Sequence, residues 1–176
     1  MIVALDNTFL TLLLNLKSVP RHGPSGQPTE FWKERVDAMI DTHSANGDTI
    51  LIPTPCLSEV LMAVPSVNKA ITVIKESTAM QIAPFDAKAA IELGIESAKA
   101  RKVGDKKSGS TEDWQKVKFD RQISIIAKTA GAEIFYTDDS NQTHFSKLIG
   151  LRVIHTWELP LPNKIAEPNF FDDPNT

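Results

Sequence analysis

Cysteine is almost absent from this sequence of 176 residues, in which Cys56 is the single one. An intrachain disulfide and a cysteine metal cage are therefore excluded, and this usage fits a reducing compartment. No apolar run approaches the roughly 20 residues of a membrane span. The N-terminus has no basic region of the kind that begins a signal peptide, and Asp6 and Asn7 interrupt its first apolar stretch. We therefore expect a cytoplasmic protein with no membrane contact.

Zinc-ligand spacings and a strong net charge are also missing. The four histidines show no paired spacing and are interpreted as surface or loop residues: His22, His43, His144 and His155. A net charge of -3 and a pI of about 5.8 argue against general affinity for nucleic acid. From Lys99 to Arg121, however, eight basic residues accompany four acidic ones. This basic segment is either a solvated helix face with a loop or a local track for phosphates.

Short apolar runs alternate with segments of helical periodicity along the chain. The runs predict strands at 2–5, 49–52, 80–83, 133–137 and 151–154. This alternation is typical of an α/β protein, and it predicts a three-layer α/β/α sandwich with a central parallel sheet. We expect one domain over residues 1–158, followed by a Pro-rich extended tail over 159–176.

Capping signals set the expected limits of the helices. After a helix at 9–16 and a Pro-rich loop at 18–28, Thr29 is the expected N-cap of the next helix, and Thr54 that of the one after the second strand. Ser110 and Asp113 have the layout of a capping box before a helix at 112–130. Residues 140–144 are expected to form a loop, with a short helix at 145–149.

Five acidic residues fall where one edge of the predicted sheet would collect them. Asp6 follows the first strand, Asp138 and Asp139 follow the fourth, and Glu59 lies early in the helix after the second. Asp120 lies in the long helix among apolar neighbours. Ligands of open α/β sheets bind at the carboxyl ends of the strands. Carboxylates that meet there repel one another, and Mg²⁺ or Mn²⁺ relieves that repulsion. Phosphodiester hydrolysis is the chemistry that best uses such a site.

Each acid also has an ordinary structural interpretation. Alone, each would be assigned to a turn or cap, to the dipole of a helix, or to a pair with a lysine in the same helix. Their joint placement at one edge favours the functional interpretation.

Four stretches, in this order, resemble the PIN-domain ribonucleases seen as VapC-type toxins of bacterial and archaeal toxin–antitoxin systems. They are Leu5–Leu10, Thr54–Val60, Phe119–Ala127 and Tyr136–Asp139. The resemblance covers nearly the whole chain. It implies a doubly wound sheet, a Mg²⁺ or Mn²⁺ site and cleavage of single-stranded RNA that leaves 5′-phosphate and 3′-hydroxyl ends.

The resemblance also implies roles for individual residues. Asp6, Glu59, Asp120 and Asp139 match the catalytic and metal-binding acids, and Asp138 stays open as an alternative to Asp139. Asp6, Asp120 and Asp139 would hold the metal that activates water, and Glu59 would orient that water or complete the shell of a second metal. Thr8 and Thr137 would support metal-bound water or a neighbouring carboxylate. The residues expected to contact the RNA backbone are Lys106, Lys107, Lys116 and Arg121.

The sequence also differs from the PIN-domain pattern in places, and other classes of protein were considered. Asn7, the Pro-rich insertion and the segment 140–144 depart from the family pattern. A haloacid-dehalogenase-type phosphatase would need an Asp at the position of Thr8, and a receiver domain would need paired acids at the first strand. The second candidate is a PIN-like module that binds RNA or protein without catalysis. By family analogy, helices at 31–43 and 67–75 would carry a homodimer or antitoxin surface.

Overall fold

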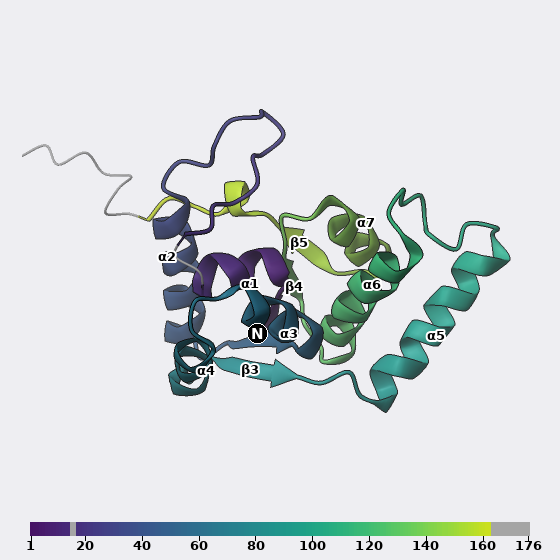
Figure 1. The fold of residues 1–176 in the computed structure, drawn as a ribbon, viewed down its shortest axis with the longest axis horizontal. Helices are drawn as coiled ribbons and strands as arrows, with labels where there is room; N and C mark the ends of the chain where they lie inside the picture. Colours follow the sequence, from purple (N-terminus) through teal and green to yellow (C-terminus); the bar gives the residue numbers. More distant parts are fainter. Residues whose placement is uncertain (15–16, 163–176) are drawn as a thin grey trace, which may run out of the picture.

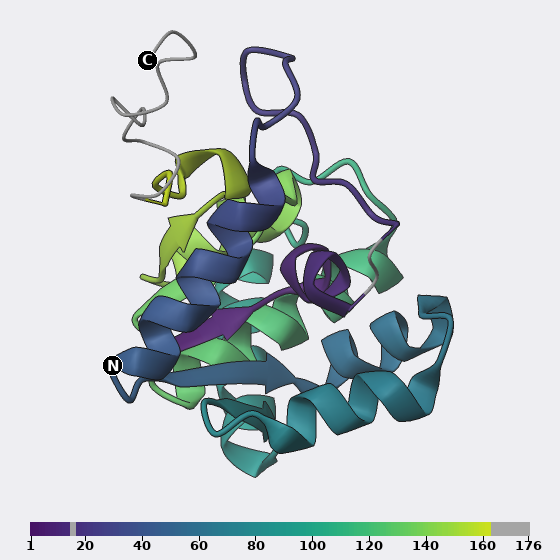
Figure 2. The same ribbon diagram turned by 90° about the vertical axis from the view of Figure 1, so that its left-hand side faces the viewer.

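The computed structural model describes residues 1–14 and 17–162, which form a three-layer α/β/α sandwich (Figures 1 and 2). The strands are β1 (Ile2–Leu5), β2 (Thr49–Pro53), β3 (Met80–Ala83), β4 (Ile134–Tyr136) and β5 (Arg152–Ile154). The helices are α1 (Asn7–Leu14), α2 (Trp32–Ala45), α3 (Thr54–Ala63), α4 (Val67–Glu76), α5 (Ala87–Lys102), α6 (Trp114–Thr129), α7 (Ser140–Leu148) and the 3₁₀ helix η1 (Thr156–Glu158). The predicted fold class and all five predicted strands are confirmed.

All the strand pairs are parallel, and the order of strands in the sheet is β3-β2-β1-β4-β5. The chain adds β2 and β3 on one side of β1 and then returns to add β4 and β5 on the other. The strand order therefore reverses between β1 and β4. Ligands of doubly wound sheets bind at such a reversal, outside the carboxyl ends of the strands.

Side chains of β1 alternate between the two faces of the sheet, as a strand buried on both sides requires. Val3 and Leu5 join one apolar cluster, to which α2 contributes Val36 and Met39. Ala4 joins a second cluster, which contains side chains of α3, α6 and α7. Figure 2 shows α2 crossing one face of the sheet while α6 lies on the other. Because both faces are covered, β1 is buried and its carboxyl end is held rigidly.

Several predicted helix limits are wrong. α2 begins after Phe31, which occupies the cap position with φ 53°, so Thr29 is not the cap. Thr54 is the first residue of α3 and not its cap, which is Pro53. α6 begins at Trp114, and the Asp113 side chain at its cap position makes no capping hydrogen bond. Ser110 Oγ instead accepts from Glu112 N at 3.2 Å, a local bond within the preceding loop.

Residues 140–144 are helical and not a loop. α7 starts at Ser140 because Asp139 caps it, with its carboxylate accepting from Asn141 N and Gln142 N. The first helix also begins two residues before its predicted start, at Asn7, and predicted positions 15 and 16 lie outside the described residues.

The interpretation of His43 as a surface residue is wrong. Its side chain is buried between α2 and the sheet, where Nδ1 contacts Asp48 Oδ2 and Nε2 contacts the Tyr136 hydroxyl, both at 2.8 Å. The amino group of Met1 also donates to Asp48, at 2.8 Å. Helical periodicity alone does not reveal such a network, because Tyr136 and the N-terminus come from distant parts of the chain.

The residue that follows η1 still belongs to the apolar core. Leu159 is buried in the cluster that includes α2, and its carbonyl accepts from the Arg35 guanidinium. Most of the predicted tail, residues 163–176, lies outside the described part of the chain. None of the described helices has the length and apolar character needed to cross a membrane.

Candidate active site at the carboxyl edge of the sheet

Asp6 is buried at the end of β1, and three groups donate hydrogen bonds to it. Its Oδ1 accepts from Thr8 Oγ1 at 2.6 Å and from Phe9 N at 3.1 Å. Its Oδ2 accepts from Thr137 Oγ1 at 2.5 Å. Burial nevertheless raises the pKa of Asp6 to about 7, because removal from water disfavours the charged form more than these bonds favour it.

Thr8 and Thr137 tie the ends of β1 and β4 together. Thr8 Oγ1 accepts from Asp138 N at 2.9 Å, and Thr137 Oγ1 accepts from Asp139 N at 3.0 Å. Each hydroxyl has a single proton and gives it to Asp6, so the direction of both bonds is set. The two threonines therefore fix the Asp6 carboxylate relative to the turn after β4.

The two aspartates after β4 have different partners. Asp138 accepts from both the backbone N and the hydroxyl of Thr156, at 2.8 and 2.6 Å, so both of its oxygens serve η1. Asp139 Oδ1 caps α7, and its Oδ2 lies 3.1 Å from Arg21 Nη2. Asp139 lines the same cavity as Asp6, whereas Asp138 lines a neighbouring one. The structure therefore favours Asp139 as the fourth acid of the site.

Asp120 and Glu59 complete the set from α6 and α3. Burial, reinforced by the charge of Asp139, raises the pKa of Asp120 to about 6. Burial also raises the pKa of Glu59, which accepts a hydrogen bond from Asn7 Nδ2. The four acids line one cavity of about 480 Å³. This cavity thus gathers four of the five acids that the sequence nominated, and Asp138 lines the neighbouring cavity.

Three buried oxygen atoms at this cavity have no hydrogen-bond donor among the described residues. They are Asn7 Oδ1, Asp120 Oδ2 and Gln142 Oε1, and all three residues line the cavity. The amide nitrogen of Asn7 donates to Glu59, and that of Gln142 donates to the Asp120 carbonyl. Because both partners are acceptors, the nitrogen of each amide must point toward them and its oxygen must point away.

Unpaired oxygens beside carboxylates match the donor set of a hard cation. In this arrangement, no three His, Cys, Asp or Glu side chains of residues 1–14 and 17–162 are grouped closely enough to hold a metal ion. Thr8, Thr137 and the Phe9 amide occupy the oxygens of Asp6, and Arg21 holds one oxygen of Asp139. The residue types fit Mg²⁺ or Mn²⁺, and displacement of Arg21 would free one oxygen of Asp139 for such an ion.

Sequence reasoning missed Asn7, Gln142 and Arg21 as contributors to the cavity. Asn7 was noted only as a departure from the family pattern. Gln142 was assigned to a loop, although Asp139 followed three residues later by Gln142 has the spacing of a helix start. Arg21 comes from the Pro-rich loop, which carries no sequence signal that points toward the site.

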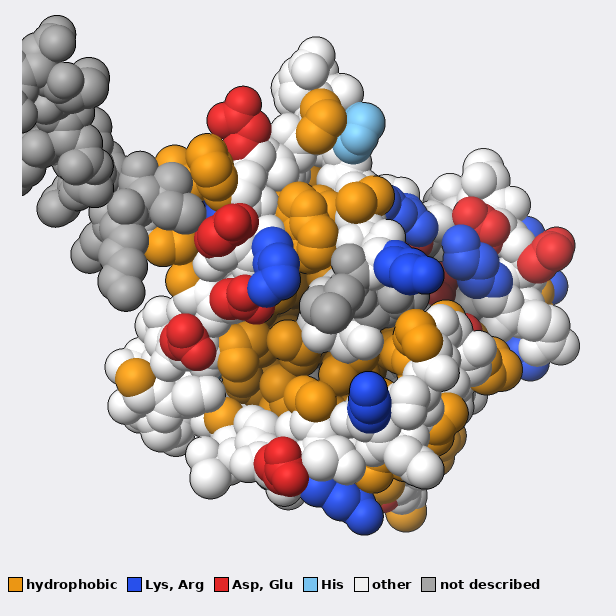
Figure 3. Space-filling view, turned by 60° about the vertical axis from the view of Figure 1, so that its left-hand side comes forward, with side chains coloured by type: hydrophobic (Ala, Val, Ile, Leu, Met, Phe, Trp, Pro, Cys, Tyr) orange, Lys and Arg blue, Asp and Glu red, His pale blue; other side chains and the backbone are white. Residues whose placement is uncertain are grey.

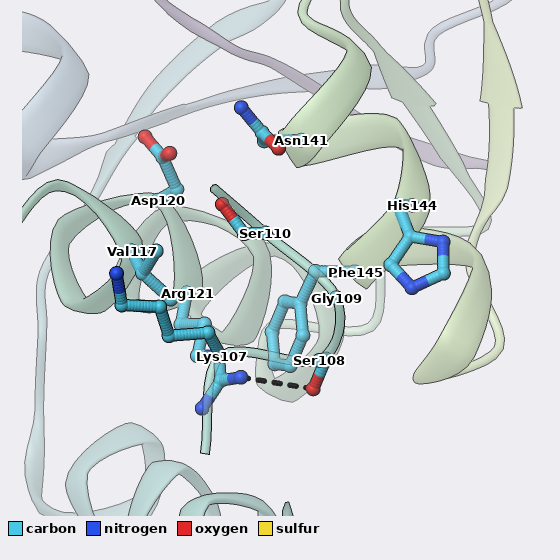
Figure 4. A pocket seen from close by; sticks show the side chains of 10 residues that line it. All are labelled: Lys107, Ser108, Gly109, Ser110, Val117, Asp120, Arg121, Asn141, His144 and Phe145. Carbon is cyan, nitrogen blue, oxygen red and sulfur yellow. Dashed lines mark hydrogen bonds between the residues drawn. The ribbon is translucent and has the colours of Figure 1, made fainter. Parts of the chain in front are cut away.

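The basic residues expected to contact RNA fall in three different settings. Lys116 lines the carboxylate cavity and pairs with Glu112 at 3.1 Å. Lys106 lies over the Trp114 ring. Lys107 and Arg121 line a second, smaller cavity that adjoins the first at Asp120 (Figure 4). Arg121 is only 2% exposed, so it is not part of a surface track.

Comparison with solved structures supplies an independent test of the fold. No protein-family model and no curated protein matches the sequence. A chain in the crystal structure of VapBC2 from Rickettsia felis, bound to a DNA fragment from their promoter, matches with a TM-score of 0.58 at 14% identity, over 88% of this chain and 98% of that one. DNA-bound VapBC from Salmonella typhimurium matches with a TM-score of 0.57 at 15% identity, over 89% and 98%.

VapBC-1 from nontypeable Haemophilus influenzae matches with a TM-score of 0.53 at 13% identity, over 89% of this chain and 98% of that one. Identities this low establish the fold alone. The resemblance to VapC-type proteins inferred from the sequence is thus confirmed at the level of the fold. The chain has the PIN-like three-layer α/β/α fold that occurs in these VapBC structures.

Proposed function

We propose that this protein is a Mg²⁺- or Mn²⁺-dependent endoribonuclease that hydrolyses phosphodiester bonds of single-stranded RNA. The observation that carries the proposal is the carboxylate cavity at the reversal of strand order, where four acids and three unpaired buried oxygens come together. Buried polar atoms are costly unless they are paired, so a site that retains three of them is built for a ligand. Oxygen atoms select a hard cation over zinc or copper.

The residues of the cavity divide the work of hydrolysis between them. A Mg²⁺ or Mn²⁺ ion held by Asp6, Asp120 and Asp139 would polarise the phosphoryl group and activate a water molecule. Thr8 and Thr137 keep the Asp6 carboxylate in one orientation. Glu59, fixed by Asn7, accepts a hydrogen bond from the attacking water and so orients it.

Basic side chains at the rim complete the site. Lys116 and Arg21 line the cavity and supply positive charge to the phosphate oxygens of the substrate. An external water attacks in this scheme, and the 2′-hydroxyl takes no part. The products therefore carry 5′-phosphate and 3′-hydroxyl ends.

Cleavage of single-stranded RNA by wild type, Asp6→Asn and Asp41→Asn tests the proposal. Asp41→Asn is the matched control, because it makes the same change at an exposed position on α2. We expect cleavage with Mg²⁺ or Mn²⁺ by wild type and Asp41→Asn, none with chelator, and a loss of at least about 100-fold in Asp6→Asn. Equal cleavage by Asp6→Asn and wild type would refute the assignment of the site.

The second candidate is a PIN-like module that binds RNA or protein without catalysis. It is favoured by the Arg21–Asp139 ion pair, which holds one of the four acids away from an ion. Calorimetric titration with Mn²⁺ separates the two. Saturable binding that is lost in Asp6→Asn supports the enzyme, whereas no binding supports the module.

The fold also suggests a setting for this activity. The three structures compared above are of VapBC proteins, and two of them contain DNA. We propose by analogy that the chain is the toxin of a cytoplasmic toxin–antitoxin pair and forms a homodimer. The side on which α2 and α4 lie carries a broad patch of hydrophobic side chains (Figure 3), and Val67 and Val73 of α4 are exposed. Light scattering of the purified chain, alone and with a co-expressed neighbouring gene product, tests both associations.

A further inference from the structure

A second cavity lies beside the carboxylate site and shares one wall with it. Its volume is about 140 Å³, and Asp120 borders both cavities. The loop between α5 and α6, the first turns of α6 and the middle of α7 enclose it (Figure 4). A space of this size holds about one ring or one phosphate group, which is too little for a whole nucleotide.

Arg121 brings to this cavity a buried positive charge that has no ion-pair partner among the described residues. Its side chain is buried, and no carboxylate of the described residues forms an ion pair with it. Nη2 donates to Ser108 Oγ at 2.9 Å, while Nη1 is buried without a partner in the described part of the chain. The guanidinium lies 5.0 Å from the centre of the Phe145 ring and 5.6 Å from that of Trp114.

A buried charge without a partner is costly, and natural proteins keep one where a ligand of opposite charge binds. The two aromatic rings offset part of this cost, since cation–π contacts contribute about 0.5–2 kcal/mol each. They also hold the guanidinium in place, so it is oriented before any ligand arrives. Burial lowers the pKa of Arg121, and the charge of Asp105 offsets part of this effect. The Asp105 carboxylate is itself bound to the backbone N–H groups of Lys107 and Gly109.

The remaining polar side chains of the cavity are those that bind oxyanions. Hydroxyl, amide, imidazole and ammonium groups line it and can donate hydrogen bonds: Lys107, Ser108, Ser110, Asn141 and His144. The one acid that lines this cavity is Asp120, which is also a proposed metal ligand of the carboxylate site. Bound metal would therefore leave this cavity more strongly positive.

We propose that this cavity is a phosphate subsite, which holds the RNA phosphate next to the one that is cleaved. The role as an RNA subsite rests on the proposed function, whereas the affinity for a phosphate group does not. The adjoining walls at Asp120 place a flanking phosphate beside the scissile one along the backbone. The subsite anchors the strand through charge and shape, so it acts on any base sequence.

Binding of inorganic phosphate to the full chain in chelator tests the subsite apart from catalysis. Trp114 contacts Arg121, so its fluorescence serves as a probe next to calorimetry. We expect saturable binding at millimolar phosphate in wild type. Ser110→Phe should weaken it at least about tenfold, because a ring fills the cavity without removing Arg121. Arg121→Lys should also weaken it, and Lys102→Ala, an exposed change on α5, should not.

The outcomes separate the two proposals. Phosphate binding that is absent in wild type, or unchanged in both Ser110→Phe and Arg121→Lys, overturns the subsite. Asp6→Asn should bind phosphate as wild type does, because Asp6 does not line this cavity. A wild-type protein that binds phosphate but does not cleave RNA would contradict only the nuclease assignment. With RNA as substrate, Ser110→Phe should raise KM while kcat stays within about twofold. Circular dichroism confirms that each variant is folded.

Discussion

Asp120→Asn should make the metal-free protein more stable while it abolishes the proposed activity. The Asp120 carboxylate has a buried oxygen without a partner, and it shares its cavity with Asp139 and Glu59. The neutral amide has nearly the same shape but carries no charge. It therefore removes both the desolvation cost and the repulsion that raise the pKa of this group.

The size of the effect follows from the pKa in the folded and unfolded chain. The pKa rises from 3.8 to about 6 on folding, which corresponds to at most about 3 kcal/mol of destabilisation at neutral pH. The side chain is partly exposed, so solvent screening reduces the expected gain to about 1–2 kcal/mol.

The sign of the effect sets its pH dependence. Below 3.8 the carboxyl is protonated in both states, so wild type and variant should be equally stable. Between 3.8 and about 6 the unfolded chain ionises first, so wild type loses stability relative to the variant as the pH rises. Above about 6 the full difference is present.

Urea unfolding in chelator at about pH 4 and about pH 8 measures this difference. We expect the unfolding midpoint of Asp120→Asn to be clearly above that of wild type at the higher pH and close to it at the lower one. Asp41→Asn controls for a change of charge elsewhere. Saturating Mn²⁺ should stabilise wild type and leave the variant nearly unchanged. A variant that is less stable than wild type at about pH 8 in chelator, or equally shifted at both pH values, would refute the reasoning.

Three further variants probe contacts around the site. Arg21→Ala frees an oxygen of Asp139, so calorimetry should show Mn²⁺ binding about 2- to 10-fold tighter; weaker binding would mean that Arg21 supports the site. Thr137→Val removes the hydroxyl that donates to Asp6 and accepts from Asp139 N, with little change of side-chain shape. It should lower the free energy of unfolding, measured in urea, by about 1–3 kcal/mol. His43→Leu breaks a buried network and should cost about 2–4 kcal/mol without a change in RNA cleavage, whereas lost cleavage in a folded variant would link that network to the site.

The sequence by itself determined the strands and the acids that follow them. Apolar runs that end in acids predict buried strands with carboxylates at their tips, because burial on both faces demands continuous apolar residues and the chain turns polar where it emerges. Parallel strands end at one edge, so the placement of Asp6 and Asp139 at the same edge followed from the order of elements. Glu59 and Asp120 lie on helices, and the resemblance to PIN-domain ribonucleases supported their assignment to the same site. Local patterns predicted the starts of helices less well: Phe31 and Asp113, and not Thr29 and Ser110, occupy the cap positions of α2 and α6.

Only the tertiary structure decided which partners these side chains take. Thr156 donates two hydrogen bonds to Asp138, whereas Asp139 lines the cavity with the other acids. This difference depends on a residue 18 positions after Asp138. Arg121 reads in the sequence as one more basic residue, yet helix packing buries it between two aromatic rings. The physical reason is the same in both cases. Periodicity reports which face of an element is buried, whereas charge pairing and hydrogen bonding depend on which distant segment arrives opposite that face.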